Sequence, residues 1–139
     1  MPVELSAEVP RDRSAPMRAR DLLRARFAAE LGPSELKDAE VVVSELVSNA
    51  LLHGDGAIRL RLDYEDGVLR GEVIDDGPGF EAAVLPHAFE RFTSYPGSGG
   101  GMGLGLAITA AIAAAHGGHV SAANPLAGGA EVRLRLPAG

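Results

Sequence analysis

The stretch ELVSNALLHG, residues 45–54, combines a helical repeat of aliphatic side chains with polar side chains at helical spacing. Glu45 and Asn49 lie four residues apart, so on a helix they share one face with Leu52 and His53. Two interpretations are open. The polar side chains form a solvated stripe on an amphipathic helix, or Glu45 is a carboxylate base beside the Asn49 amide oxygen, which binds Mg²⁺.

Helical signals extend in both directions from this stretch. Residues 16–31 place aliphatic side chains on one side of a helix and arginines elsewhere, and a Gly-Pro pair ends that run. Ser34 is positioned to cap a second helix, which continues to about His53. A third helix is predicted over residues 103–116, with two following glycines as its stop.

Alternation of apolar and polar residues predicts the strands, which cover residues 3–7, 58–62, 68–74, 119–123 and 130–136. The first is an edge strand that leads with its linker to about residue 15, and the second and third form a hairpin. The loop that follows the hairpin is long for a compact domain, which favours a lid or binding loop. The order of elements predicts a single domain, residues 1–139, folded as an α/β (α+β) two-layer sandwich with helices on one face of one sheet.

Composition excludes several classes of function. With 13 basic and 19 acidic residues the net charge is −6, which argues against a general nucleic-acid or anionic-membrane binder. Cysteine is absent, which excludes disulfides, thiolate catalysis and Cys-ligated metals. Residues 92–130 contain no charged Asp, Glu, Lys or Arg, but glycines interrupt this stretch too often for a bilayer span. No apolar secretory signal begins the sequence, so we expect a cytoplasmic enzyme or binding domain.

A second motif, Asp75-Asp76-Gly77-Pro78-Gly79, follows directly after a predicted strand. Carboxylates at the end of a strand, followed by glycines, allow the backbone to turn sharply and approach a ligand. Two acids here also suit the orientation of a base or a metal. The alternative is an ordinary turn, because Asp, Gly and Pro are common turn residues.

A third motif is the glycine-rich run over residues 97–108, which opens the third predicted helix. Unobstructed N–H groups at a helix N-terminus suit phosphates. The run lacks the ending of a Walker P-loop and the strand and acid of a Rossmann fingerprint. A flexible linker is the alternative, but the run continues directly into an apolar helix, which favours phosphate binding. Before it, Phe89 and Phe92 flank Glu90 and Arg91, which either pin a loop to the core or bring Arg91 to a terminal phosphate.

Taken in order, these motifs resemble those of the GHKL ATPases, which include DNA gyrase, the heat-shock chaperone, sensor histidine kinases and mismatch-repair ATPases. Residues 45–50 match the N box, residues 75–79 the first glycine box and residues 101–106 the second. Residues 89–92 look like the F box of histidine kinases, and the resemblance covers residues 16–137. It implies the Bergerat fold, with a mixed sheet and helices on one face.

The resemblance implies ATP and Mg²⁺ as cofactors and a role for each matching residue. Asn49 would ligate the Mg²⁺ that bridges the phosphates, and Glu45 would be the catalytic base or position the acceptor. Asp75 would accept a hydrogen bond from the adenine amino group, and residues 81–100 would form the ATP lid. The other nucleotide-binding residues would be Gly77 and Gly79 beside the adenine, and Gly101, Gly103, Leu104 and Gly105 around the phosphates.

The two halves of the chain resemble different branches of this superfamily. The N-terminal half, through residues 45–54, resembles anti-sigma-factor serine/threonine kinases, which implies phosphate transfer to Ser or Thr of a partner, control of a sigma factor and its antagonist, and a homodimer. The C-terminal half resembles a histidine-kinase ATP domain, which would act in a response-regulator pathway. A nucleotide-gated binding switch without turnover is a further alternative. All four histidines lie inside the matched region, and Asp76 replaces the Asn most common in kinase glycine boxes.

Overall fold

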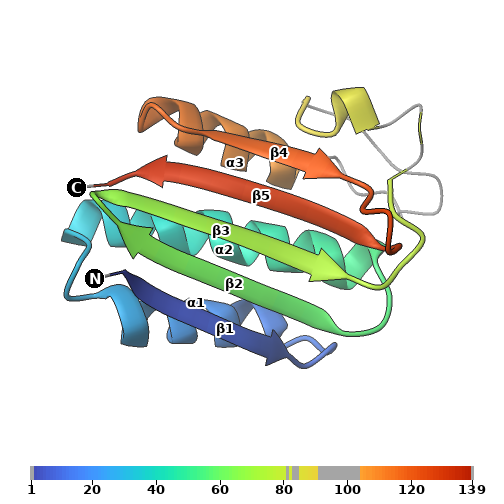
Figure 1. Cartoon of the computed structure of the whole chain (residues 1–139), viewed down its shortest axis with the longest axis horizontal. Helices are drawn as coiled ribbons and strands as arrows, with labels where there is room; N and C mark the ends of the chain where they lie inside the picture. Colours follow the sequence, from blue (N-terminus) through green and yellow to red (C-terminus); the bar gives the residue numbers. More distant parts are fainter. Residues whose placement is uncertain (1, 81, 83–84, 91–103, 139) are drawn as a thin grey trace.

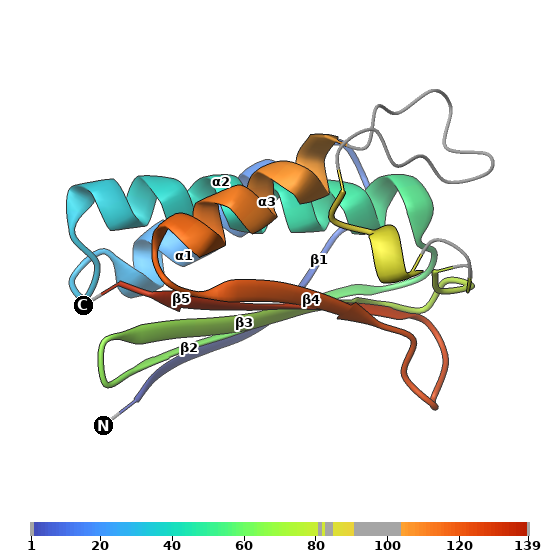
Figure 2. The same ribbon diagram turned by 90° about the horizontal axis from the view of Figure 1, so that it is seen from above.

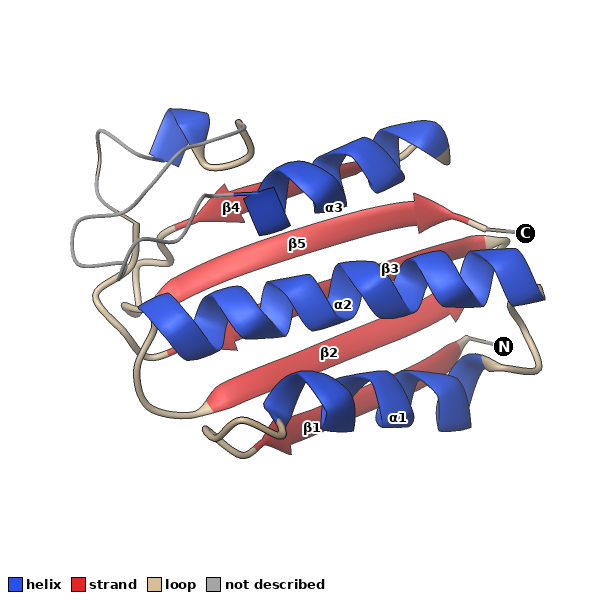
Figure 3. Cartoon of the chain, turned by 180° about the vertical axis from the view of Figure 1, so that it is seen from behind, coloured by secondary structure: helices blue, strands red, loops and turns tan. Residues whose placement is uncertain are grey.

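Helices cover one face of a single sheet in the computed structural model, which describes residues 2–80, 82, 85–90 and 104–138 (Figures 1 and 2). The order along the chain is β1 (Val3–Val9), α1 (Ala15–Phe27), α2 (Pro33–His53), β2 (Ile58–Glu65), β3 (Val68–Asp75), the 3-10 helix η1 (Leu85–His87), α3 (Leu104–Ala115), β4 (His119–Ala123) and β5 (Ala130–Pro137). This is the predicted two-layer α/β sandwich, with the three helices side by side across the sheet (Figure 3).

The strand order is β1-β2-β3-β5-β4, and every neighbouring pair is antiparallel. The expectation of a mixed sheet is therefore wrong. The physical reason is the placement of β5. The crossover from β3 through α3 returns to β4 in the direction of β3, but β5 lies between these two strands and is antiparallel to both. The parallel pair that a mixed sheet requires is thus never in hydrogen-bonding contact.

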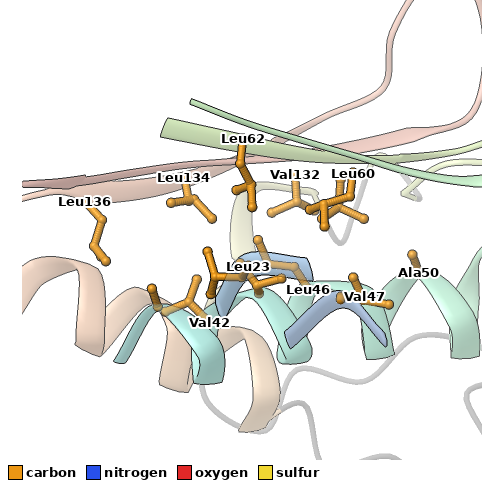
Figure 4. Close-up of a cluster of buried hydrophobic side chains, with 14 of the residues drawn as sticks. Leu23, Val42, Leu46, Val47, Ala50, Leu60, Leu62, Val132, Leu134 and Leu136 are labelled. Atoms are coloured by element: carbon orange, nitrogen blue, oxygen red, sulfur yellow. The ribbon is translucent and has the colours of Figure 1, made fainter. Parts of the chain in front are cut away.

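The core lies between the sheet and the helices because each strand turns alternate side chains toward them. Leu60 and Leu62 of β2 point toward the helices, and Leu46 and Val47 of α2 face them (Figure 4). The opposite face of the sheet carries charged side chains, and β2 alternates between buried leucines and exposed arginines. The most deeply buried side chains, all without measurable exposure, include Leu23, Phe27, Leu46, Ile58, Leu60, Leu69 and Leu136.

Two helix boundaries differ from their predicted positions. α1 ends at Phe27, not at Leu31, and residues 28–30 form a turn in which the N–H of Glu30 donates to the Phe27 carbonyl with the tighter i→i+3 spacing, at 3.0 Å. This turn brings Leu31 into the core. α2 begins at Pro33, a residue favoured in a first helical turn, so the predicted cap Ser34 lies inside the helix.

The end of α3 is as predicted. The N–H of Gly118 donates to the Ala113 carbonyl at 2.8 Å and the N–H of Gly117 to the Ala114 carbonyl at 3.0 Å. Gly117 has φ +77, which completes a Schellman motif. Among the described helices, none is long and apolar enough to cross a bilayer.

One end of the molecule collects the segments that carry the sequence motifs. The C-terminal ends of α2 and β3, the β4–β5 turn and η1 all lie there, on the right in Figure 1. The chain also leaves β1 at this end, through the turn that contains Arg11.

Candidate functional site

Asp75, the last residue of β3, is a buried carboxylate held by main-chain groups. The residue is 4% exposed, and its Oδ1 accepts a hydrogen bond from the N–H of Gly77 at 2.7 Å. Burial raises the pKa of the Asp75 carboxyl, while hydrogen bonds from the N–H groups of Gly77 and Asp55 and the charge of Arg11 act in the opposite direction. The site therefore holds a preorganised hydrogen-bond acceptor at the end of a strand.

The loop after α2, residues 54–56, interlocks with the turn after β3. The N–H of Asp76 donates to the Asp55 carbonyl at 2.9 Å. A Cβ on Gly77 would stand 2.8 Å from both the Asp55 nitrogen and the Asp75 Oδ1, so the close approach of the two loops requires a glycine there. The structure thus gives Gly77 a packing role inside the protein, next to its expected role beside the adenine.

Asn124 fixes the segment that follows this turn. Its side-chain Oδ1 accepts from the N–H of Phe80 and its Nδ2 donates to the Phe80 carbonyl, both at 2.7 Å. Gly79 has φ +82, and a Cβ there would stand 2.7 Å from the Asn124 Oδ1. A Cβ on Gly129, in the same β4–β5 turn, would overlap the Asp75 carbonyl oxygen. The β4–β5 turn therefore packs against residues 75–80, which include the first glycine box, and fixes their main chain.

Glu45 and Asn49 are both half-buried on α2, while Leu52 of the same predicted stripe is 72% exposed. Burial lowers the pKa of His53, at the end of the helix. The C-terminal end of α2 lies beside the Asp75 carboxylate, since Gly54, the C-cap of the helix, packs directly against this carboxylate. The structure thus places the helix that carries Asn49 at the same end of the fold as Asp75.

Asn49 offers one amide oxygen to Mg²⁺, so a phosphate ligand and water would have to supply the remaining ligands. Within the described ranges, no three His, Asp or Glu side chains gather as a metal site. Mg²⁺ is commonly held by one or two protein oxygens, with phosphates and water completing the octahedron. A single amide oxygen on α2 fits that arrangement.

Some of the predicted site residues lie outside the described residues, namely Gly101, Gly103 and most of the lid over 81–100, with Arg91 and Phe92. Leu104 and Gly105 form the beginning of α3. In the described part of the predicted lid, Phe89 is half-buried against the core and the His87 Nδ1 lies against the Glu90 carboxylate.

Arg11, Gly54 and Asn124 are structural contributors that the motifs do not reveal. Arg11 donates from Nε to the Gly56 carbonyl at 2.7 Å and from Nη1 to two carbonyls of the last turn of α2. A signal for Asn124 existed, since Asn before Pro is typical of a turn that needs side-chain hydrogen bonds. Arg11 has no such local signal, because its partners are main-chain carbonyls some 40 residues away.

Comparison with known proteins gives a consistent result. Residues 35–139 match the family described as histidine kinase-, DNA gyrase B- and HSP90-like ATPases. Over 98 residues, or 69% of this chain, the sequence is 46% identical to the sensor histidine kinase component HK1 of Mycobacterium tuberculosis. Over 113 residues, or 78% of this chain, it is 42% identical to the histidine-protein kinase AfsQ2 of Streptomyces coelicolor. The chain spans 58% of HK1 and 20% of AfsQ2.

Solved structures agree in fold. The full-length ShkA structure, a complex with AMPPNP, matches 96% of this chain with 31% of its own, at a TM-score of 0.66 and 26% identity. The ATP-binding domain of PrrB from Mycobacterium tuberculosis matches 75% of this chain with 69% of its own, at a TM-score of 0.58 and 30% identity. This chain is thus an ATP-binding domain of the histidine-kinase type, and it belongs to the family of histidine kinase-, DNA gyrase B- and HSP90-like ATPases.

Proposed function

We propose that this chain binds Mg·ATP at the end of the fold where α2 and β3 terminate, and donates the γ-phosphoryl group to a histidine of a partner protein or partner segment. The observation that carries the proposal is the buried Asp75 carboxylate, held by the N–H groups of Gly77 and Asp55 beside the end of the helix that bears Asn49. This arrangement combines an acceptor for an adenine amino group with an oxygen ligand for Mg²⁺.

Each residue has a distinct task in this proposal. Asp75 accepts a hydrogen bond from the adenine 6-amino group, which selects adenine over guanine. Asn49 holds Mg²⁺, and the glycines of residues 101–105 provide N–H groups to the phosphates. When bound, Mg·ATP supplies the phosphoryl group: the bond between its γ-phosphorus and the β–γ bridging oxygen breaks, and a bond to the acceptor nitrogen forms. Glu45 takes the proton that the acceptor releases.

Transfer to histidine is favoured because the relatives described above carry the names of histidine kinases. The chain spans only part of those proteins, so the acceptor histidine, a response-regulator partner and a homodimer are further parts of the proposal. A second candidate is transfer to Ser or Thr of a sigma-factor antagonist. The residues 45–54 motif supports it, but the comparisons fit the histidine alternative better.

The first experiment is calorimetric titration of the purified chain with Mg·ATP. We expect binding by the wild type, a loss of roughly tenfold or more in Asp75→Asn, and loss of the Mg²⁺-dependent part of the affinity in Asn49→Ala. Asp76→Asn is the matched control: the same chemical change is made one residue away, at an exposed carboxylate that pairs with Arg59 at 3.1 Å. Absence of binding in the wild type would refute the proposal, and equal losses in both Asp variants would refute the role of Asp75.

The acceptor is then identified by the chemistry of the product. Incubation with radiolabelled ATP and candidate partners gives an acid-labile phosphoramidate if histidine is the acceptor and an acid-stable ester if Ser or Thr is. In either case Glu45→Gln should retain Mg·ATP binding and lose transfer. Unchanged transfer by Glu45→Gln would exclude Glu45 as the base.

A further inference from the structure

Arg11 connects the N-terminal part of the chain to the end of α2. Its Nη1 donates to the carbonyls of Ala50 and Leu51, each at 3.0 Å, and its Nε donates to the Gly56 carbonyl at 2.7 Å. The first two carbonyls belong to the last turn of α2, where a positive charge is favourable, and the Ala50 carbonyl also accepts from the N–H of Gly54 at 2.9 Å. The third lies in the loop over residues 54–56. One planar guanidinium thus fixes the helix end and the loop together.

The loop over residues 54–56 is in direct contact with the Asp75 carboxylate. The N–H of Asp55 donates to the Asp75 carboxylate, and the Asp55 carbonyl accepts from the N–H of Asp76 at 2.9 Å. The Asp75 carboxylate occupies the space that a side chain at position 54 would take, since a Cβ there would stand 2.5 Å from both of its oxygens. A shift of the loop would therefore move the carboxylate.

The turn that carries Arg11 is itself fixed. The side chain of Asp12 accepts hydrogen bonds from both the N–H and the hydroxyl of Ser14, and the N–H of Ala15 donates to the Asp12 carbonyl at 3.0 Å. On the other side, β1 pairs with β2 along its whole length, from Val3 opposite Tyr64 to Val9 opposite Ile58. The main chain on both sides of Arg11 is therefore held in place by hydrogen bonds.

The Nη2 of Arg11 is buried and has no hydrogen-bond partner among the described residues. A buried charged donor without a hydrogen bond is costly, so it requires a compensating interaction. The charge of this guanidinium lowers the pKa of the Asp75 carboxyl, so the guanidinium and the buried carboxylate attract each other.

From these contacts we infer that Arg11 is a positioning residue of the nucleotide site, which holds residues 54–56 so that the Asp75 carboxylate faces the adenine amino group. The inference rests on the proposed function. It extends the site beyond the residues 35–139 that match the family, into the β1–α1 turn. The N-terminal strand and turn then contribute to nucleotide selection as well as to the sheet.

The test compares Arg11→Met and Arg11→Lys with Arg26→Met. Arg26 is a matched control because it also ties the N-terminal segment through a main-chain carbonyl, that of Glu4 at 2.8 Å, but at the far end of β1. Two ligands are titrated, ATP and purine riboside triphosphate, which lacks the 6-amino group. We expect Arg11→Met to weaken ATP binding about tenfold and the binding of the analogue less than about twofold. Arg11→Lys, which keeps the charge without the planar fork, should fall between wild type and Arg11→Met.

A second measurement does not depend on nucleotide. Amide hydrogen exchange in the free protein should become faster at Asp55 and Gly77 in Arg11→Met, with no such change in Arg26→Met. If Arg11→Met loses the same affinity for both nucleotides, or if exchange at these two amides is unchanged, the inference is overturned. If the wild type binds neither nucleotide, the proposed function fails, while the exchange experiment still decides whether Arg11 holds the loop. If Arg11→Met does not fold, Arg11→Lys is used for both measurements.

Discussion

The carboxyl group of Asp75 packs against the Cα of Gly54, so closely that a Cβ on residue 54 would stand 2.5 Å from both carboxylate oxygens. Gly54 is the C-cap of α2 and has φ −93, a conformation that any residue adopts. Glycine is therefore required here for space and not for backbone freedom. The contact joins the end of the N box helix to the end of β3, the two elements that carry the proposed Mg²⁺ and adenine contacts.

Gly54→Ala should displace the Asp75 carboxylate and weaken Mg·ATP binding by about tenfold, with a loss of about 1–3 kcal/mol in the free energy of unfolding. The control is Gly32→Ala at the other end of α2. A Cβ there would meet only the end of the flexible Glu35 side chain, which can move away. Titration and thermal unfolding of both variants check this prediction, and equal behaviour of the two would contradict it.

Nucleotide binding should depend on the protonation of Asp75. Burial raises the pKa of this carboxyl above its ordinary value of 3.8, so the folded protein takes up the proton at a higher pH than the unfolded chain. As the pH falls through the raised pKa, the anionic acceptor disappears and affinity for ATP should fall. ATP titrations from about pH 7.5 down to about pH 4.5 check this, with Asp75→Asn as the variant whose weak residual binding lacks that dependence.

The same shift has an opposite consequence for stability. Because the folded pKa is raised, the ionised form costs stability, and the free energy of unfolding declines as the pH rises through the window between 3.8 and the folded pKa. Asp75→Asn should therefore be at least as stable as the wild type at neutral pH, although its affinity for ATP is lower. A large drop in its melting temperature at neutral pH would show that the anion stabilises the free protein.

Asn124 should be needed to hold the glycine turn. Asn124→Ala removes the two hydrogen bonds to Phe80 and should cost about 1–2 kcal/mol in the free energy of unfolding. Asn124→Asp keeps the acceptor for the Phe80 N–H and loses the donor, so we expect an intermediate effect. Denaturant unfolding measures both. If Asn124→Asp loses as much free energy of unfolding as Asn124→Ala, the hydrogen bond donated by the Asn124 amide carries the whole contribution.

On the outer face of the sheet, Glu72 and Glu131 share a hydrogen bond, flanked by Arg61 and Arg133. This bond raises the pKa of Glu72 above 4.5 because the protonated carboxyl donates to Glu131. The stability that this bond contributes is present while Glu72 is protonated and Glu131 is ionised, and it is lost as the pH rises through the folded pKa of Glu72. Glu72→Gln keeps a donor at every pH, so its melting temperature relative to wild type should increase between about pH 4 and about pH 7.

The elements of the fold could be predicted from the sequence because each has one buried face. The predicted strands over 58–62 and 68–74 lie inside β2 and β3, and the two glycines after α3 end it as expected. The neighbours of each strand could not be predicted in this way. The alternating Val132, Leu134 and Leu136 indicate a strand with one apolar face, but that pattern is the same whether β5 lies at an edge or between β3 and β4.

The candidate site was predictable to the extent that it consists of local motifs. Asp75 and Asn49 follow from short patterns of acids, amides and glycines. Arg11 and Asn124 do not, because their partners are main-chain groups that the fold brings near, and any residue supplies such groups. The steric reason for a glycine at position 54 could not be predicted either, since a glycine after a helix is already explained as a C-terminal cap.

The central position of β5 has a consequence for the order in which the protein forms. Its residues come last among the strands, yet they pair with β3 from Val68 opposite Pro137 to Asp75 opposite Ala130. During synthesis β3 presents an open hydrogen-bonding edge until residues 130–137 leave the ribosome, and β4 has no strand to join. Pairings of such long sequence separation form slowly. A nascent chain is therefore exposed to aggregation through β3, and the turn at Gly129, which packs against the main chain of Asp75, joins the proposed nucleotide site only once β5 has formed.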